Sequence, residues 1–321
     1  MGKNEMKKVD LLLKRARTGD ADAQAALGLC YNNGEGVRKN YKEAVKWWLK
    51  AAEQGHAEAQ ECLGELYFLG YGVSEDKVEA VKWWCKAANQ GDVFAQCNLG
   101  VCYHDGVGVV EDKMEAVKWY RKAAGQRSAQ AQYNLGLCYR DGDGVGQSKT
   151  KAIKWFRLSA EQGYHEAQYN LGVCYHDGEG IEKDDFEAVK WYRLAAEQGY
   201  AQAQYNLGCC YDFGDGVDED KAEAVKWYRK AVKQGYAAAQ CNLGYCYEYG
   251  YGVKKDMKKA VVWYRKAAEQ GDAVAQCNLG ECYLNGEGVA KNKKTSIKWF
   301  RLSAAQGYDV AKEALRNMLG E

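Results

Sequence analysis

The chain has 321 residues, with 45 lysines and arginines against 44 aspartates and glutamates, which gives a formal net charge of +1 at pH 7. This balance excludes the large basic excess that is typical of proteins held on nucleic acid or anionic membranes by bulk charge. No apolar run approaches the roughly 18 residues that a membrane-spanning helix needs, so we expect no membrane insertion. The N-terminus lacks an apolar signal region, which favours a cytoplasmic protein unless a signal peptide has been removed.

A 36-residue pattern recurs eight times without insertion or deletion. The glycine of a Leu-Gly pair falls at Gly28, Gly64, Gly100, Gly136, Gly172, Gly208, Gly244 and Gly280. A tryptophan falls at Trp47, Trp83, Trp119, Trp155, Trp191, Trp227, Trp263 and Trp299. Self-similarity at a period of roughly 20–50 residues indicates a stack of like structural units, and such a stack has no internal domain boundary. We therefore predict one solenoid domain over residues 1–321.

In chain order, the prediction begins and ends with half a repeat. Residues 1–19 match only the second half of the pattern and are expected to cap the N-terminal end of the stack. Residues 20–307 form the eight full repeats. Residues 308–321 match only the first half, with Arg316 in place of the recurring glycine. A large charged residue suits a terminal unit, because the outer face of such a unit must be polar.

Each full repeat is predicted to contain two helices. In the first repeat, apolar residues at helical spacing predict a helix over residues 21–33 that ends at Gly34. The second helix follows a residue whose side-chain oxygen can accept from the free backbone amides of the first turn. These predicted N-cap residues are Asn40, Asp76, Asp112, Ser148, Asp184, Asp220, Asp256 and Asn292. Five of the second helices carry glutamate three residues after the cap, which predicts capping boxes.

Three motifs carry a family resemblance: Ala-Gln-x-Asn-Leu-Gly-x-x-Tyr, Gly-x-Gly-Val, and Ala-Val-Lys-Trp-x-x-Lys-Ala-Ala-Glu-Gln-Gly. Across essentially the whole chain they resemble the Sel1-like repeat (SLR) family, whose members are α-solenoids related to the tetratricopeptide repeats. The resemblance implies an all-α fold, namely a right-handed superhelical α/α solenoid of about 18 helices. One departure is that the proline usually found after Gly-Val is absent, since the chain contains no proline.

The 13 cysteines do not predict a disulfide scaffold. Seven of them share one repeat position between the glycine and the tyrosine, which is typical of a small buried hydrophobic residue. These are Cys30, Cys102, Cys138, Cys174, Cys210, Cys246 and Cys282. The cysteine-rich secreted branch of the family pairs two cysteines of neighbouring helices, but here Cys97, Cys241 and Cys277 face Ala88, Val232 and Ala268. That disulfide framework cannot form.

No motif supports catalysis or cofactor binding. His104-Asp105 and His176-Asp177 stand two repeats apart, too far for the three or four converging ligands of a zinc site. Ser-x-x-Lys occurs at Ser74 and Ser148, without the Ser-Asp-Asn and Lys-Thr-Gly partners of serine β-lactamases. We expect no enzyme, no cofactor and no metal. The alternatives that stay open are a β-lactamase-like hydrolase, implied by the cysteine-rich branch, and an RNA-binding repeat protein, which the missing basic groove disfavours.

Two recurring residue types admit a structural and a binding interpretation. The tryptophan and the aromatic after it either pack the second helix or form a row of stacking platforms for bases or sugars. Six asparagines either join neighbouring repeats or grip the backbone of an extended peptide. They are Asn98, Asn134, Asn170, Asn206, Asn242 and Asn278. We favour the structural interpretation for the aromatic pair, because ligand contacts rarely require the same residue in every unit. For the asparagines we favour it because the related tetratricopeptide repeats carry a similar asparagine.

Five positions of the first helix vary while the frame stays fixed, those of residues 22, 25, 29, 32 and 33 in repeat one. By resemblance to tetratricopeptide repeats they face a concave groove, where we count eleven acidic side chains and Arg140 as the only basic one. The aromatics Phe68, Tyr133, Tyr169, Tyr205, Phe213 and Tyr249 are expected to be exposed there. The candidate ligand-binding residues are His104, Asp105, Tyr133, Arg140, Asp141, Tyr169, His176, Asp177, Tyr205, Phe213, Tyr245 and Tyr249.

An acidic groove with aromatic anchors favours ligands of opposite charge. We therefore expect a non-enzymatic scaffold or adaptor that binds a partner protein or an extended peptide with a basic segment. Nucleic acid is not an expected partner.

Overall fold

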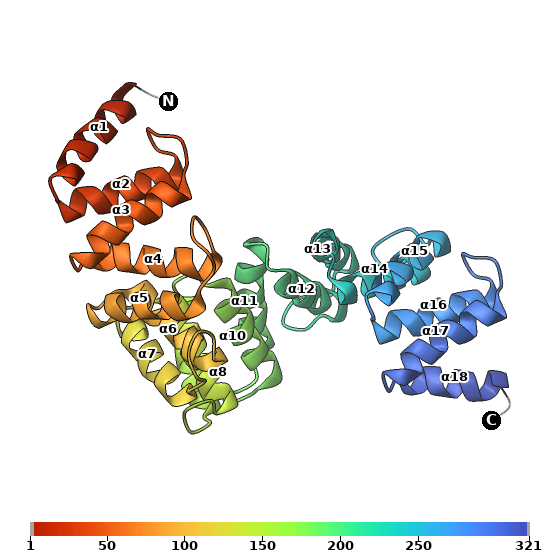
Figure 1. Cartoon of the computed structure of the whole chain (residues 1–321). Helices are drawn as coiled ribbons and strands as arrows, with labels where there is room; N and C mark the ends of the chain where they lie inside the picture. Colours follow the sequence, from red (N-terminus) through yellow and green to blue (C-terminus); the bar gives the residue numbers. More distant parts are fainter. Residues whose placement is uncertain (1–2, 320–321) are drawn as a thin grey trace. The chain divides into compact units, whose positions relative to one another are not determined.

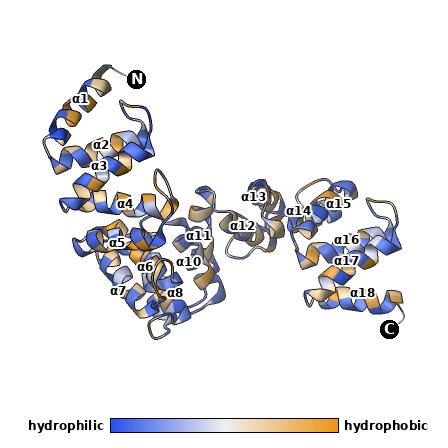
Figure 2. Ribbon diagram, in the orientation of Figure 1, coloured by the Kyte–Doolittle hydropathy of each residue, from blue (hydrophilic) through white to orange (hydrophobic). Residues whose placement is uncertain are grey.

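The computed structural model describes residues 3–319, and every regular element in that range is an α-helix (Figure 1). Residues 1, 2, 320 and 321, which belong to the two predicted half-repeats, lie outside the described part. No helix among residues 3–319 is long and apolar enough to cross a bilayer. Figure 2 shows hydrophobic and hydrophilic residues interleaved along the helices.

The eighteen helices of the described range alternate as predicted. The first helices of the repeats are α2 (Ala21–Asn33), α4 (Ala57–Leu69), α6 (Val93–Asp105), α8 (Ala129–Asp141), α10 (His165–Asp177), α12 (Ala201–Phe213), α14 (Ala237–Tyr249) and α16 (Ala273–Asn285). The second helices are α3 (Tyr41–Glu53), α5 (Lys77–Asn89), α7 (Lys113–Gly125), α9 (Lys149–Ala160), α11 (Asp185–Glu197), α13 (Lys221–Lys233), α15 (Met257–Glu269) and α17 (Lys293–Ala305). The two half-repeats are α1 (Lys3–Arg17) and α18 (Asp309–Leu319). The all-α solenoid of 36-residue helix-turn-helix repeats is thus confirmed.

The chain divides into two compact units, Met1–Gln162 and Gly163–Glu321. The first unit contains α1 to α9 and the second contains α10 to α18.

The turn between the two helices of a repeat is held by backbone and cap together. In repeat two, the side chain of Asp76 accepts from the amide of Glu79 at 2.9 Å, as an N-cap should. The reciprocal half of the predicted capping box is replaced. The amide of Asp76 donates to the carbonyl of Tyr67 at 2.9 Å, and the Glu79 carboxylate pairs with Lys82. The carbonyl of the tyrosine near the end of the first helix therefore fixes the start of the second.

The recurring glycine permits close approach of the two helices. A Cβ atom added at Gly64 would lie 2.4 Å from the ring of Trp84, and one added at Gly136 would lie 2.6 Å from the ring of Phe156. Such distances are far inside van der Waals contact. Glycine is therefore required where the second aromatic of each repeat lies against the first helix.

The aromatic pair of the second helix divides into a fully buried and a variably buried member. The second member is buried throughout, with Phe156 at 0% exposure. The tryptophan is buried in four repeats, but Trp155, Trp191, Trp263 and Trp299 are only half-buried. Trp83, for example, packs in one core cluster with Val45 of the preceding repeat and Leu66 of its own repeat. The structural interpretation of the pair holds, but Phe156 and not Trp155 is the core residue of repeat four.

Buried glutamines join neighbouring repeats within each unit, a role the sequence analysis gave to asparagine. Nε2 of Gln60 donates to the carbonyl of Ala52 in the preceding repeat at 2.9 Å, and its Oε1 accepts from Gln90 at 2.8 Å. The same pair of bonds is made by Gln24, Gln96, Gln132, Gln204 and Gln276. Asn242 does join two repeats, since its amide donates to the hydroxyl of Tyr228 at 3.2 Å.

The cysteines behave as core residues. All 13 lie within the described range and no disulfide joins any of them. Six of the seven at the shared repeat position are buried, and Cys174 is half-buried. Burial raises the pKa of the Cys102 and Cys138 thiols to about 11.

Candidate functional site

Side chains at the five variable positions line hollows on the first helices, and we call the surface that they form the variable face. The position of residue 25 belongs to the core in four repeats, where it holds Ala25, Cys97, Cys241 and Cys277. It carries three hollows: one between α4 and α6, one between α6 and α8, and one between α14 and α16. Most of the side chains that line the first two hollows, and four of the nine that line the third, occupy the variable positions. Each unit therefore has at least one hollow lined by residues of several variable positions.

The hollow between α4 and α6, of about 420 Å³, is here called the Glu61 pocket. It is lined by Glu61, Glu65, Phe68, Leu69, Trp84, Phe94, Asn98, Val101, Cys102 and Gln130. Burial raises the pKa of Glu61 to about 7, and the negative charges of Asp92 and Glu65 add to the effect. The sequence analysis did not choose Glu61, Glu65 or Phe94 as ligand residues. The available signal was two glutamates one helical turn apart at variable positions.

The hollow between α6 and α8, of about 290 Å³, contains a charge network centred on His104. Nδ1 of His104 lies 2.6 Å from Asp105, and Nε2 lies 3.3 Å from Asp143. Lys113 donates to Asp143 at 2.7 Å and holds the pKa of that carboxyl below its ordinary value. The predicted residues His104 and Asp105 are thus brought together, with two partners that sequence reasoning missed.

Arg140 and Asp141, also candidate residues, form a two-bond ion pair with each other. Nε and Nη2 of Arg140 each donate to the Asp141 carboxylate at 2.8 Å. The one basic side chain counted on the predicted groove is therefore engaged by its acidic neighbour, and both are less available to a ligand than the sequence suggested.

In the second unit the candidate histidine, His176, contacts an aspartate of the following helix and not the aspartate next to it in the sequence. Nδ1 of His176 lies 2.7 Å from Asp185 at the start of α11, while Asp177 is exposed. Asp212, counted among the acidic groove residues, is buried at 8% exposure and pairs with Lys221 at 3.1 Å. Its carboxylate also accepts from the hydroxyl of Tyr228 at 3.1 Å. Asp212 is therefore a structural residue.

The predicted row of exposed tyrosines is half-buried. The rings of Tyr133, Tyr169 and Tyr205 lie 5.8, 6.0 and 6.0 Å from the buried aromatics Phe156, Tyr192 and Tyr228. Tyr169 and Tyr205 also contact Tyr200 and Tyr236 at 5.3 Å. Phe68 is half-buried as well. These rings fill space on the variable face and do not stand free on it.

Three exposed tyrosines of the second unit lie on α14 and in the turn that follows it, and two further exposed aromatics, Phe186 and Phe213, lie on α11 and α12. Phe213 is 68% exposed, and Tyr245 and Tyr249 lie with ring centroids 4.5 Å apart. Tyr251, which was not a candidate, stacks on Tyr249 at 5.7 Å. The adjoining hollow between α14 and α16, of about 490 Å³, is lined by Glu248, Tyr249, Lys255, Met257, Asn278, Glu281, Cys282, Asn285 and Glu287.

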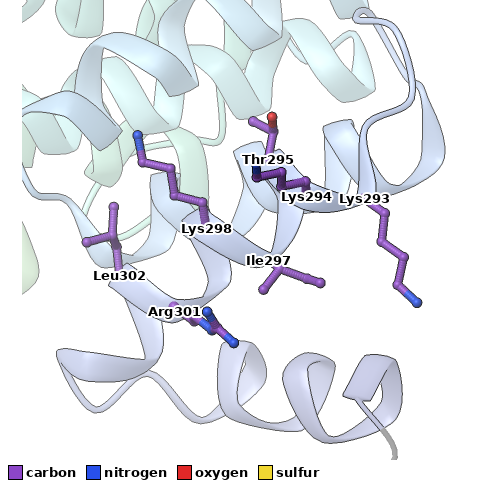
Figure 3. A pocket seen from close by; sticks show the side chains of 7 residues that line it. All are labelled: Lys293, Lys294, Thr295, Ile297, Lys298, Arg301 and Leu302. Carbon is purple, nitrogen blue, oxygen red and sulfur yellow. The ribbon is translucent and has the colours of Figure 1, made fainter.

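A larger hollow, of about 890 Å³, lies along α17, the second helix of repeat eight (Figure 3). Its lining is basic with an apolar floor and comes from Lys293, Lys294, Thr295, Ile297, Lys298, Arg301 and Leu302. Val45, at the position of Ile297, packs against Trp83 of the next repeat. The hollow is lined by residues of a second helix and is therefore not part of the variable face.

One of the two Ser-x-x-Lys matches in the sequence has a structural explanation. The hydroxyl of Ser148 accepts from the amide of Lys151 and caps α9, so its place in a Ser-x-x-Lys match reflects helix capping. Among residues 3–319 no three histidine, cysteine or acidic side chains stand close enough to hold a metal ion. The arrangement can recognise charge and apolar surface.

The repeats match the sequence profile described as "Sel1 repeat" in eight consecutive windows: 21–56, 57–92, 93–128, 129–164, 165–200, 201–236, 237–272 and 273–308. The structure is similar to that of a protective antigen of uropathogenic Escherichia coli strains that displays an SLR fold. The identity is 40%, the TM-score is 0.88, and the match covers 97% of this chain and 67% of that one. A Sel1 repeat protein from Oxalobacter formigenes matches with 35% identity and a TM-score of 0.71, over 96% of this chain and 89% of that one. No curated protein matches the chain in sequence.

Proposed function

The chain belongs to the Sel1 repeat family, whose members are generally non-enzymatic protein-interaction scaffolds, and we propose that it is an adaptor that holds a basic, extended segment of a partner protein on its variable face. Neither nucleic acid nor a membrane is a partner in this proposal, because phosphate groups would be repelled by the same carboxylates.

One observation supports the proposal most directly: each unit has a hollow on the variable face where two glutamates stand beside an aromatic ring. In the second unit, burial and then the charge of Glu248 raise the pKa of Glu281, and Glu248 raises the pKa of Tyr249 to about 12. The shift of Tyr249, whose main cause is the charge of Glu248, indicates negative potential at this ring, which a cationic ligand would relieve.

The test uses a phage-displayed library of random twelve-residue peptides, selected on the full chain. We expect enrichment of peptides that carry lysine or arginine together with apolar residues. The affinity of the best peptides should fall steeply between about 50 and 500 mM salt, because exposed charge pairs are screened over that range. Enrichment of acidic peptides, or affinity that is indifferent to salt, would overturn the proposal.

A double charge-reversal variant tests whether the peptides bind at the variable face. The variant E65K/E281K changes one glutamate in the hollow of each unit, and we expect it to lower peptide affinity by about tenfold or more. The matched control E53K/E197K makes the same charge change at exposed ends of α3 and α11, away from the variable face. Equal losses in both variants would mean that only overall charge matters. Circular dichroism checks that both variants are folded.

A further inference from the structure

We infer that the Glu61 pocket receives an arginine side chain of the partner segment. The inference rests on the proposed function and names the residue type that the first unit selects. The pocket has acidic and aromatic walls, and other repeats of this chain hold a flat ring at the same position.

The pocket combines a forked acidic wall with aromatic walls. Glu61 and Glu65 stand one turn apart on α4 and both line it. Phe68 and Trp84 contact each other with ring centroids 5.3 Å apart, and Phe94 on α6 is 71% exposed. A guest in this hollow meets carboxylates and ring faces together.

Other repeats of the same chain show what fits beside the aromatic of the second helix. In repeats four to six the position of Glu61 holds Tyr133, Tyr169 and Tyr205, whose rings contact the aromatic that corresponds to Trp84. In repeat two this position holds the shorter Glu61, Phe68 packs on one part of Trp84, and the hollow is lined by both Glu61 and Trp84. A flat group is thus already accommodated at this position three times in the chain.

The guest must be flat and positively charged. The guanidinium group of arginine is planar, stacks on aromatic faces and forms two parallel bonds to carboxylates, whereas the lysine ammonium is compact and strongly hydrated. The rim already holds one cation on a ring, since Nζ of Lys77 lies 3.6 Å above the centre of Phe68. Lys77 pairs with Glu75 at 3.2 Å, and no lysine or arginine of the described residues forms an ion pair with Glu61 or Glu65.

The experiment selects the same peptide library on the full chain, with depletion on the variant E61Y. That substitution installs the tyrosine of repeats four to six and should fill the pocket. We expect the surviving peptides to share an arginine. Replacing this arginine by citrulline, which is flat but neutral, should weaken binding to the wild type by about tenfold or more, and replacing it by lysine should weaken it several-fold.

A second variant keeps the test decisive if E61Y does not fold. E61Q/E65Q removes both charges with little change of shape, and on it the arginine and citrulline peptides should bind equally. The control E53Q/E197Q removes two exposed charges elsewhere and should preserve the wild-type preference for arginine.

The outcomes separate this inference from the proposed function. Peptides that lose affinity on E65K/E281K but bind E61Y and E61Q/E65Q as well as wild type would overturn the arginine pocket and leave the adaptor proposal standing. So would a selected set with lysine and no arginine. Failure to select any peptide that depends on the variable face would overturn both.

Discussion

Glu61 illustrates how a single residue on the variable face departs from an ordinary surface carboxylate. It is half-buried, and its pKa is raised to about 7 from an ordinary 4.5, first by burial and then by the charges of Asp92 and Glu65. A hydrogen bond from the Cys62 thiol to the Glu61 carboxylate lowers this pKa and so partly opposes the shift. A group with this balance is suited to binding a cation, because a ligand supplies the charge compensation that the free protein lacks.

The raised pKa predicts how stability depends on pH. Between about pH 4.5 and 7 the folded chain retains a proton on Glu61 that the unfolded chain releases, so this residue contributes less stability as pH rises. The variant E61Q stays neutral throughout. We expect it to match the wild type near pH 5 and to exceed its free energy of unfolding at pH 8 by about 1–3 kcal/mol.

Denaturant unfolding at several pH values measures this difference, with the exposed Glu53→Gln as control. A gap between E61Q and wild type that stays constant from pH 5 to pH 8 would contradict the assigned pKa. A gap of the same size in the control would show a general effect of charge.

At the scale of the helices, the joint after α7 is the irregular one. The other seven second helices are followed by glycine in the left-handed region, as at Gly91 with φ +96°, but here Arg127 adopts φ +66°. It is the only non-glycine residue with positive φ among residues 3–319. A side chain in this region strains the backbone.

We expect Arg127→Gly to stabilise the chain by about 0.5–1 kcal/mol, because the relief of strain exceeds the entropy that glycine adds to the unfolded state. The reverse change, Gly91→Arg, should destabilise it. No atom lies within 4 Å of a Cβ built at Gly91, so the loss would come from the backbone alone. Thermal unfolding distinguishes the variants, and a neutral or destabilising Arg127→Gly would show that the turn is not strained.

Helix order and caps were predictable because each signal occurs eight times in one register. Adjacent aromatics were not resolved, since Trp155 and Phe156 both border the apolar stripe of α9 and only packing decides that Phe156 is the buried one. The burial of Tyr169 depends on its contact with Tyr200 of the next repeat. The contact of His176 with Asp185 depends on the turn between the two helices. These contacts occur in only one or two repeats, so no eightfold signal in the sequence marks them.

The candidate site was predictable as a surface but not as a set of groups. Variation against a fixed frame marks positions that line the hollows, but it also marked the position of residue 25, which is buried in four repeats. Their charge was overestimated, since Asp212 is buried and Arg140 and Asp141 form an ion pair with each other. The Glu61 pocket was missed because a hollow arises from what neighbouring repeats leave empty.

For the whole molecule, the fold should not depend on redox conditions. Each repeat is held by helix packing, by glutamine bonds and by glycine contacts, and no disulfide contributes. We expect melting temperatures with and without reductant to agree within about 2 °C, whereas loss of a structural disulfide typically costs about 2–5 kcal/mol.

Burial also raises the pKa of thiols such as Cys97, to about 11, so little thiolate exists at pH 8. Alkylation by iodoacetamide should therefore be slow in the folded chain and complete only in denaturant. A fall in melting temperature of more than about 5 °C on adding reductant, or rapid labelling of all 13 thiols without denaturant, would mean that the cysteines are not the inert core residues that their burial indicates.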